Sequence, residues 1–215
     1  MKTILCYGAS NTWGYKPDPS AVLPIRYSYK QRWTGILQSK LGDEFLVIEE
    51  GLNSRTTVID DPLNDDRNGK AYLKPCLESH APLDFVALML GTNDLKVRFG
   101  LSASEIVYAI ETLVQVIRTH SLIAQTYVPK VLVLSPPPVG KLSKEEEPMF
   151  VGAKEKSQEI SKMLKISAVT YKYDLLDTHE FISSSDLEGD GIHLPEESHK
   201  KLGLAVFEKI LEMSK

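Results

Sequence analysis

The sequence predicts a single three-layer α/β/α domain built around a mostly parallel, five-stranded sheet. Short apolar runs rich in β-branched residues recur along the chain, and stretches with helical periodicity fall between them. The runs are near-continuous rather than alternating, as expected of strands covered on both faces, and strands that alternate with helices form parallel sheets. The chain has 215 residues, of which 42% are hydrophobic, so it can bury one sizeable core. We therefore expect one domain over residues 1–215.

The apolar runs give the predicted strands, which are in chain order Thr3–Tyr7, Phe45–Glu49, Asp84–Leu90, Lys130–Ser135 and Val169–Tyr173. The fourth run stops at Pro136-Pro137-Pro138, because proline lacks the N–H group that a strand needs. The charge-rich segment Lys141–Pro148 that follows is predicted to be a solvated surface loop, with a lid over a site as the alternative.

Four stretches have the periodicity of helices, namely Gln31–Leu41, Ser102–His120, Glu155–Lys165 and Glu196–Ser214. The second has the clearest apolar stripe and opens with Ser102 followed three residues later by Glu105, which is a capping-box pattern. Pro195 leads into the last helix and suits a first helical turn. The acidic segment Asp60–Asn68 lacks the spacing of an EF-hand, so a capped turn is favoured there over a calcium site.

Composition argues against several classes of partner. The formal net charge of −4 and the pI of about 5.8 disfavour nucleic acid or an anionic membrane surface. The two cysteines, Cys6 and Cys76, form no metal-binding spacing and no disulfide framework. The first apolar run is too short for a signal peptide, and no stretch is expected to reach transmembrane length. We expect a cytoplasmic protein with no membrane partner and no metal or organic cofactor.

Polar segments follow the first three predicted strands at their carboxyl ends, where open parallel sheets bind ligands. Ser10 follows the first strand within Gly8–Gly14, Gly51 follows the second, and Asn93 lies in Gly91–Asp94 after the third. Taken alone, Ser10 could be a helix N-cap or a nucleophile, and Asn93 could be a turn former or a donor to an oxyanion. The glycines match neither a dinucleotide fingerprint nor a P-loop, and the Gly-x-Ser-x-Gly elbow is absent.

Asp190 and His193 stand three residues apart before the last predicted helix. One turn can present both side chains to the same place, so that the acid fixes the tautomer of the imidazole. The other four histidines have no such acid-plus-turn context; they are His80, His120, His179 and His199. Together with Ser10, this pair supplies the nucleophile, base and orienting acid that acyl transfer through a serine ester requires.

Four motifs then occur in the order of a known family: Cys6–Gly14, Glu49–Thr57, Met89–Asp94 and Asp190–His193. They resemble the motifs of the SGNH hydrolases, the GDSL esterase/lipase superfamily, over essentially the whole chain. The resemblance implies a flavodoxin-like fold with Ser10 as nucleophile, His193 as base and Asp190 as orienting acid. It also implies an oxyanion hole made by the backbone N–H groups of Ser10 and Gly51 and the side chain of Asn93.

The residues of the first three motifs are similar to those of the arylesterase/acyltransferase branch of that superfamily. The same holds for Arg32–Gly35 and Ser135–Pro138. This implies a homo-oligomer that hydrolyses or transfers small acyl groups of aryl or alkyl esters through an acyl-enzyme on Ser10. Trp13 and Tyr15 are candidates for pocket walls, with packing of the first loop as their alternative role. The alternative activity is carbohydrate O-acetyl ester hydrolysis on the same scaffold.

One residue departs from the family pattern: Ala9 stands where the first motif normally has aspartate. That acid braces the nucleophile turn, so its absence also leaves open a non-catalytic, ligand-binding protein. On the sequence alone, we expect Ala9→Asp to raise kcat/KM by roughly threefold to thirtyfold. The alternative is that neighbouring residues have repacked around the methyl group, in which case a buried carboxylate would lack donors and destabilise the fold.

Overall fold

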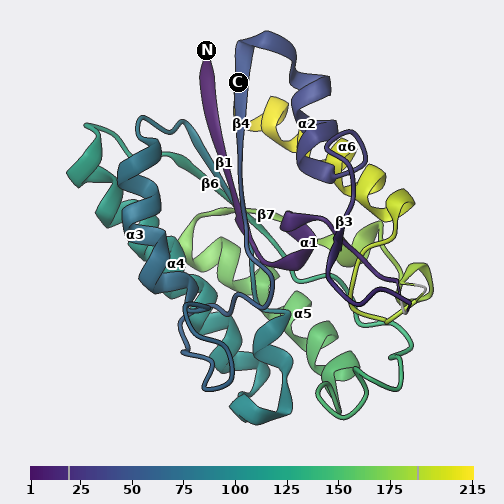
Figure 1. Cartoon of the computed structure of the whole chain (residues 1–215). Helices are drawn as coiled ribbons and strands as arrows, with labels where there is room; N and C mark the ends of the chain where they lie inside the picture. The colour runs from purple at the N-terminus through teal and green to yellow at the C-terminus, as the bar shows by residue number, and fades with distance from the viewer. Residues whose placement is uncertain (19, 188) are drawn as a thin grey trace.

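The structure is a computed structural model and describes residues 1–18, 20–187 and 189–215. Its centre is a five-stranded sheet in the order β4-β1-β5-β6-β7, in which all neighbouring strands are parallel (Figure 1). The strands are β1 (Lys2–Gly8), β4 (Phe45–Gly51), β5 (Phe85–Met89), β6 (Lys130–Leu134) and β7 (Asp174–Leu176). A small antiparallel pair, β2 (Tyr15–Lys16) and β3 (Ile25–Arg26), lies outside this sheet.

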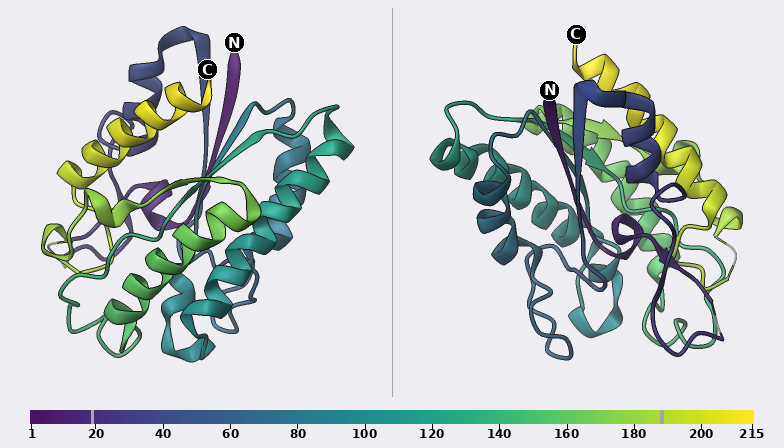
Figure 2. Two further views of the ribbon diagram at one scale, coloured as in Figure 1. Left: turned by 180° about the vertical axis from the view of Figure 1, so that it is seen from behind. Right: turned by 45° about the horizontal axis from the view of Figure 1, so that its top comes forward.

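Helices cover both faces of the sheet, which confirms the predicted three-layer fold (Figure 2). One face carries α3 (Gly69–His80), α4 (Ala103–Ala124) and α5 (Ala153–Tyr171). The other face carries α2 (Trp33–Leu41) and α6 (Glu196–Met213), and the short α1 (Ser10–Trp13) follows β1 directly. Five short 3₁₀ turns complete the described elements; they are Gly42–Glu44, Asn93–Leu95, Val97–Phe99, Thr178–Glu180 and Ser184–Asp186.

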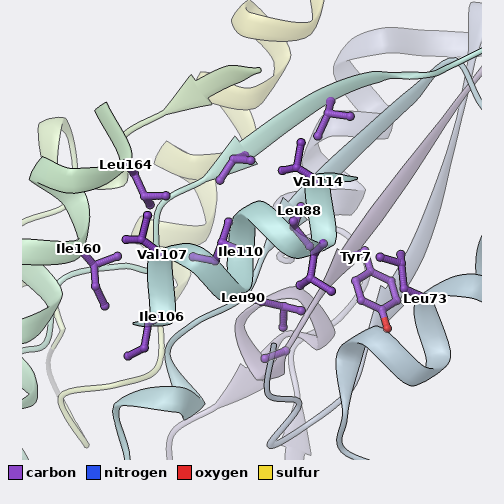
Figure 3. Packing of buried hydrophobic residues seen from close by; sticks show 14 of the residues in the cluster. Tyr7, Leu73, Leu88, Leu90, Ile106, Val107, Ile110, Val114, Ile160 and Leu164 are labelled. Carbon is purple, nitrogen blue, oxygen red and sulfur yellow. The ribbon is translucent and has the colours of Figure 1, made fainter. Parts of the chain in front are cut away.

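Strand side chains alternate between two buried clusters, one on each side of the sheet. In β1, Leu5 and Tyr7 pack with α3 and α4, whereas Ile4 and Cys6 pack toward α2 and α6. Figure 3 shows the first cluster, with Leu88 of the sheet among apolar side chains of α4 and α5. Because both faces are buried, both sets of alternating residues must be apolar, which explains the near-continuous apolar runs.

The fifth predicted strand is wrong. Val169–Tyr173 contains the last turn of α5, and the strand lies further along the chain, at Asp174–Leu176. The side chain of Val169 is exposed on the outer face of the helix. Its β-branched side chain was therefore a misleading sign of a buried strand. Lys172 then adopts a left-handed conformation with φ of 55°, which ends the helix and turns the chain into β7.

Helix α3 is absent from the sequence-based prediction. Pro75 lies inside it, and proline in a helix interior normally argues against a helix. Its N-terminus is fixed by Asn68, whose side chain accepts a hydrogen bond from the backbone N–H of Ala71 at 3.2 Å. The preceding loop contains the predicted capped turn, in which Asp61 accepts hydrogen bonds from the Leu63 N–H and the Asn64 side chain.

Helix α4 is longer than predicted. Its 22 residues are long and apolar enough to cross a membrane by length and composition, contrary to the expectation that no stretch reaches that length. In the structure its apolar face packs in the core between α3 and α5. The predicted capping box is present, since the Glu105 N–H donates to Ser102 Oγ at 3.3 Å and the Ser102 N–H donates to Glu105 Oε2 at 2.7 Å.

Candidate active site

Ser10 lies at the carboxyl end of the central strand β1, in the tight turn that begins α1. The backbone N–H groups of Thr12 and Trp13 both donate to Ala9 O, at 3.0 and 2.9 Å. Gly14 closes the turn with φ of 88°, a conformation that favours glycine. A Cβ at Gly8 would overlap the Thr12 side chain and lie 2.9 Å from Met89 O, so only glycine lets the strand turn here.

Ser10, His193 and Asp190 lie in a continuous line of hydrogen bonds. The distance from Ser10 Oγ to His193 Nε2 is 2.9 Å, and that from His193 Nδ1 to Asp190 Oδ2 is 2.6 Å. Since an ionised carboxylate only accepts hydrogen bonds, Nδ1 carries the proton and Nε2 is the acceptor for the serine hydroxyl. The structure therefore brings together the three residues that the sequence predicts as a nucleophile, a base and an orienting acid.

The environment of Asp190 keeps its carboxyl group ionised. Burial by itself would raise the pKa, but hydrogen bonds from the His193 side chain and from two backbone N–H groups outweigh it, so the pKa of Asp190 is lowered. The two N–H groups belong to Ile192 and His193 and lie 2.9 and 2.8 Å from Asp190 Oδ1. The charged acid therefore stays paired with the imidazole in the neutral pH range.

Two further residues hold His193 in place. Asn11 donates from Nδ2 to Ile192 O at 3.3 Å and accepts the Leu194 N–H on Oδ1 at 2.9 Å, so it brackets His193 along the chain. The Tyr15 ring stacks on the imidazole with the centroids 4.1 Å apart. Sequence reasoning missed Asn11, because its partners are 181 and 183 residues away and only the fold brings them together.

Ser10, Tyr15 and His193 face a cavity of about 270 Å³. Its wall consists of Ser10, Tyr15, Asn53, Ser54, Asn64, Asn93, Lys96, Arg98, Glu146, Met149, Phe150, Ile192 and His193. Glu146 belongs to the segment Lys141–Pro148, so part of this predicted surface loop forms the cavity wall. Burial raises the pKa of Glu146, and the nearby His193 opposes that rise.

Asn93 occupies the turn after β5 and is buried in the cavity wall. Its Nδ2 donates to Arg55 O at 3.1 Å, which uses one of its two amide hydrogens. The neighbouring Asp94 is fully buried and accepts the Thr57 N–H at 3.1 Å and the Thr57 hydroxyl at 2.5 Å. Burial raises the pKa of Asp94, and the hydrogen bonds from Thr57 oppose that rise. Asp94 thus joins the turn after β5 to the loop after β4, as expected of a structural acid.

The structure does not place Gly51 in this cavity, contrary to the sequence-based expectation. Gly51 is the last residue of β4, paired with Gly8, and a Cβ there would overlap the backbone of Trp13. Close packing of α1 is therefore the reason for this glycine. Three residues later, Ser54 lines the cavity with φ of 62°. Among the described residues, the backbone N–H groups of Ser10 and Ser54 have no hydrogen-bond acceptor.

The two aromatic residues proposed as pocket walls behave differently. Tyr15 lines the cavity, but Trp13 does not. The guanidinium of Arg26 lies 5.1 Å from the centroid of the Trp13 ring, and Arg26 Nε donates to Trp13 O at 2.5 Å. Trp13 therefore takes the alternative role, packing of the first loop.

A three-layer α/β fold with a Ser-His-Asp arrangement at the carboxyl ends of its strands is found in ester-hydrolysing enzymes. Comparison with family models makes the assignment specific. Residues 6–201 match the model of the GDSL-like lipase/acylhydrolase family, and the chain belongs to this family of SGNH hydrolases.

Solved structures agree with this assignment. The chain is 39% identical to the aryl esterase of M. smegmatis, with 99% of each chain covered and a TM-score of 0.93. It is 40% identical to a carbohydrate acetylesterase from Sinorhizobium meliloti, with 99% of this chain and 100% of that chain covered and a TM-score of 0.94. No curated protein sequence matches the chain. The family and these neighbours support an ester-hydrolysing enzyme.

Proposed function

We propose that the protein is a serine esterase or acyltransferase that acts on small acyl esters through a covalent acyl-enzyme on Ser10. The observation that carries this proposal is the line of hydrogen bonds from Ser10 Oγ through His193 to Asp190 at the wall of a cavity. A serine hydroxyl is a weak nucleophile by itself and needs an adjacent base that is oriented by a third group.

In the proposed reaction, His193 Nε2 takes the Ser10 proton while Oγ attacks the ester carbonyl carbon. Asp190 stabilises the imidazolium that forms, since its lowered pKa keeps it ionised. His193 then gives this proton to the oxygen of the leaving alcohol as the ester bond breaks. Water or a second alcohol attacks the acyl-enzyme, and the proton it loses passes through His193 back to Ser10 Oγ.

The proposed oxyanion hole consists of the Ser10 N–H, the Asn93 side chain and the Ser54 N–H. Ser54 replaces Gly51 in this role, because it lines the cavity and its N–H is unpaired among the described residues. The second amide hydrogen of Asn93 is not used by its bond to Arg55 O. Donors that are fixed before the reaction stabilise the charge that develops on the carbonyl oxygen.

The size and lining of the cavity support small ester substrates. Its volume of about 270 Å³ is below the usual range of drug-sized ligand sites. Tyr15, Met149 and Phe150 form an apolar part of its wall, which suits an aryl or alkyl group. The M. smegmatis neighbour is an aryl esterase.

Hydrolysis of carbohydrate O-acetyl esters is the second candidate. Part of the cavity wall is polar and includes Asn53, Asn64 and Arg98. Hydroxyl groups of a sugar can form hydrogen bonds with such residues, whereas the apolar ring of an aryl ester cannot. Specificity constants for short-chain aryl acetates and acetylated sugars, measured side by side, decide between the two candidates.

Labelling with a fluorophosphonate probe tests the proposed chemistry. We expect the unaltered protein to be labelled and to turn over ester, and Ser10→Ala to lose both while its melting temperature is kept. Ser20→Ala, which changes an exposed serine of the first loop, is the matched control and should be labelled normally. A protein that is not labelled at Ser10 would be the non-catalytic binder instead.

A further inference from the structure

A carboxylate, a thiol and an imidazole lie together outside the Ser10 cavity. They belong to Glu50, Cys76 and His80, and their ligand atoms all lie within 4.8 Å of one another. Cys76 and His80 are four residues apart on α3, so they share one face of the helix. Glu50 comes from the edge strand β4, which is why no spacing in the sequence reveals the group.

We propose that Glu50, Cys76 and His80 bind one zinc ion that links α3 to the edge strand β4. Zinc binds thiolate at about 2.3 Å and imidazole or carboxylate at about 2.0–2.2 Å, so two ligand atoms on a tetrahedral ion lie about 3.3–3.8 Å apart. The ligand atoms lie within 4.8 Å of one another, so the pair furthest apart needs to approach by no more than about 1 Å, a distance within the reach of side-chain rotation. His80 Nε2 and Glu50 Oε1, now 2.8 Å apart, would separate slightly to admit the ion.

The donor set selects the metal. Calcium and magnesium take oxygen ligands, whereas a mixed sulfur, nitrogen and oxygen set suits zinc. Zinc coordinates the thiolate, so binding releases the Cys76 proton to solvent. The thiolate and the carboxylate then balance the two charges of the ion, and the imidazole binds in its neutral form.

The surroundings make the site accessible from solvent and hold the Glu50 carboxylate in position. The side chains of His80 and Glu50 are 29% and 19% exposed, whereas Cys76 is fully buried, so the ion enters from the solvent side. Glu50 also lines a neighbouring cavity of about 670 Å³, which leaves room for water as the fourth ligand. Tyr72, one turn before Cys76, donates from its hydroxyl to Glu50 Oε1 at 3.4 Å and orients the carboxylate.

Because none of the three ligands lines the cavity at Ser10, the site is structural. Zinc adds a cross-link between α3 and β4, and an ion that binds only the folded chain stabilises it by mass action. Bound zinc should therefore raise the melting temperature and leave ester turnover unchanged.

The test uses the full chain, stripped with a chelator, dialysed and titrated with Zn²⁺ or Co²⁺. We expect one ion per chain, and for Co²⁺ a thiolate-to-cobalt charge-transfer band with the d–d bands of a tetrahedral ion. Removal of one ligand should weaken binding by at least about tenfold, since even the loss of a residue that supports a ligand costs that much. The variants are Cys76→Ser, His80→Gln and Glu50→Gln.

Two matched controls should bind as the unaltered chain does. Cys6→Ser changes an equally buried thiol outside the cluster, and His120→Gln breaks an isolated His–Glu pair, with Glu78, whose atoms lie 2.6 Å apart. His80→Gln keeps the test decisive if Cys76→Ser fails to fold, because His80 is partly exposed.

Equal zinc affinity in the unaltered chain and in His80→Gln would overturn the proposal. So would loss of ester turnover in the stripped protein, which would show that the ion is not structural. Failure of zinc binding with normal fluorophosphonate labelling leaves the proposed esterase function intact, so the two proposals fail independently.

Discussion

His193 is held from three directions by residues of different segments. Asp190 accepts its Nδ1 proton, Asn11 binds the backbone on either side of it, and Tyr15 stacks on its ring. Asp190 fixes the tautomer of the imidazole, Asn11 fixes the backbone that carries it, and Tyr15 fixes the tilt of the ring. In the proposed reaction, a base fixed in this way needs little rearrangement when it takes the proton of Ser10.

Asn93 offers the clearest single-residue test of the oxyanion hole. Asn93→Ala should lower kcat by roughly 10²–10³, because it removes one of three donors from the developing charge. Steady-state kinetics give the value, and Asn64→Ala, which removes another amide of the cavity wall, is the control. A fall in kcat below about threefold would mean that Asn93 only forms the turn after β5.

The environment of Ala9 changes the expectation drawn from the sequence. The side chain is 6% exposed and belongs to the buried apolar cluster on the α3–α4 side of the sheet. A carboxylate placed there loses its hydration, so Ala9→Asp should lower the melting temperature by several degrees rather than improve the site. Thermal unfolding and kinetics on the same samples check this. A more active variant of unchanged stability would restore the expectation from the sequence.

At the scale of secondary-structure elements, Asn11 joins α1 to the loop that carries His193. Asn11→Ala removes two hydrogen bonds and leaves the Leu194 N–H without its partner, at a cost of about 1–3 kcal/mol. We expect kcat to fall by about tenfold or more with little change in KM, because the base shifts while the cavity wall stays. Asn11→Asp keeps the acceptor for Leu194 but sets a buried carboxylate against Ile192 O, so it should not restore kcat. Equal kcat in all three proteins would show that α1 and the loop hold their positions without this link.

The sequence predicted the elements whose pattern reflects burial, and it failed where the pattern had another cause. β1 and β5 are buried on both faces, so their continuous apolar runs located them within two residues. Val169, Thr170 and Tyr171 are β-branched or aromatic because the exposed end of a surface helix tolerates such residues. Pro75 argued against a helix at α3, but packing against α4 stabilises that helix in the fold.

The site was predictable as far as it depends on local turns. Asp190 and His193 share one turn, and Ser10 follows the central strand directly, so short-range geometry places them. Gly51 does not line the cavity, and its glycine reflects close packing of Trp13 against β4. Ser54 was missed because its left-handed backbone, unusual for serine, leaves no trace in the sequence.

For the molecule as a whole, one buried histidine links stability to pH. His199 is fully buried, and its Nε2 has no hydrogen-bond partner among the described residues. Burial, aided by the charges of Arg32 and His193, lowers the pKa of His199 to about 3. An unfolded chain binds a proton here near pH 6.5, so between these two values the unfolded state holds more protons than the folded state.

Stability from His199 is therefore complete above about pH 6.5 and falls as the pH drops below that value, by about 2 kcal/mol at pH 5. The free energy of unfolding, measured in urea at pH 7 and pH 5, should show this loss. His199→Gln should reduce it, whereas His120→Gln, on the surface pair with Glu78, should not. An equal loss in His199→Gln would assign the effect to other groups.

Both ends of the chain lie near the amino ends of the central strands, whereas the cavity lies near their carboxyl ends. Met1 precedes the start of β1, and Lys130 at the start of β6 donates from its side chain to Met213 O near the other end (Figure 1). Ser10 follows the far end of β1. A tag at either end can therefore anchor the molecule to a resin with the mouth of the cavity turned toward the flowing solution, so immobilisation should not slow the arrival of substrate.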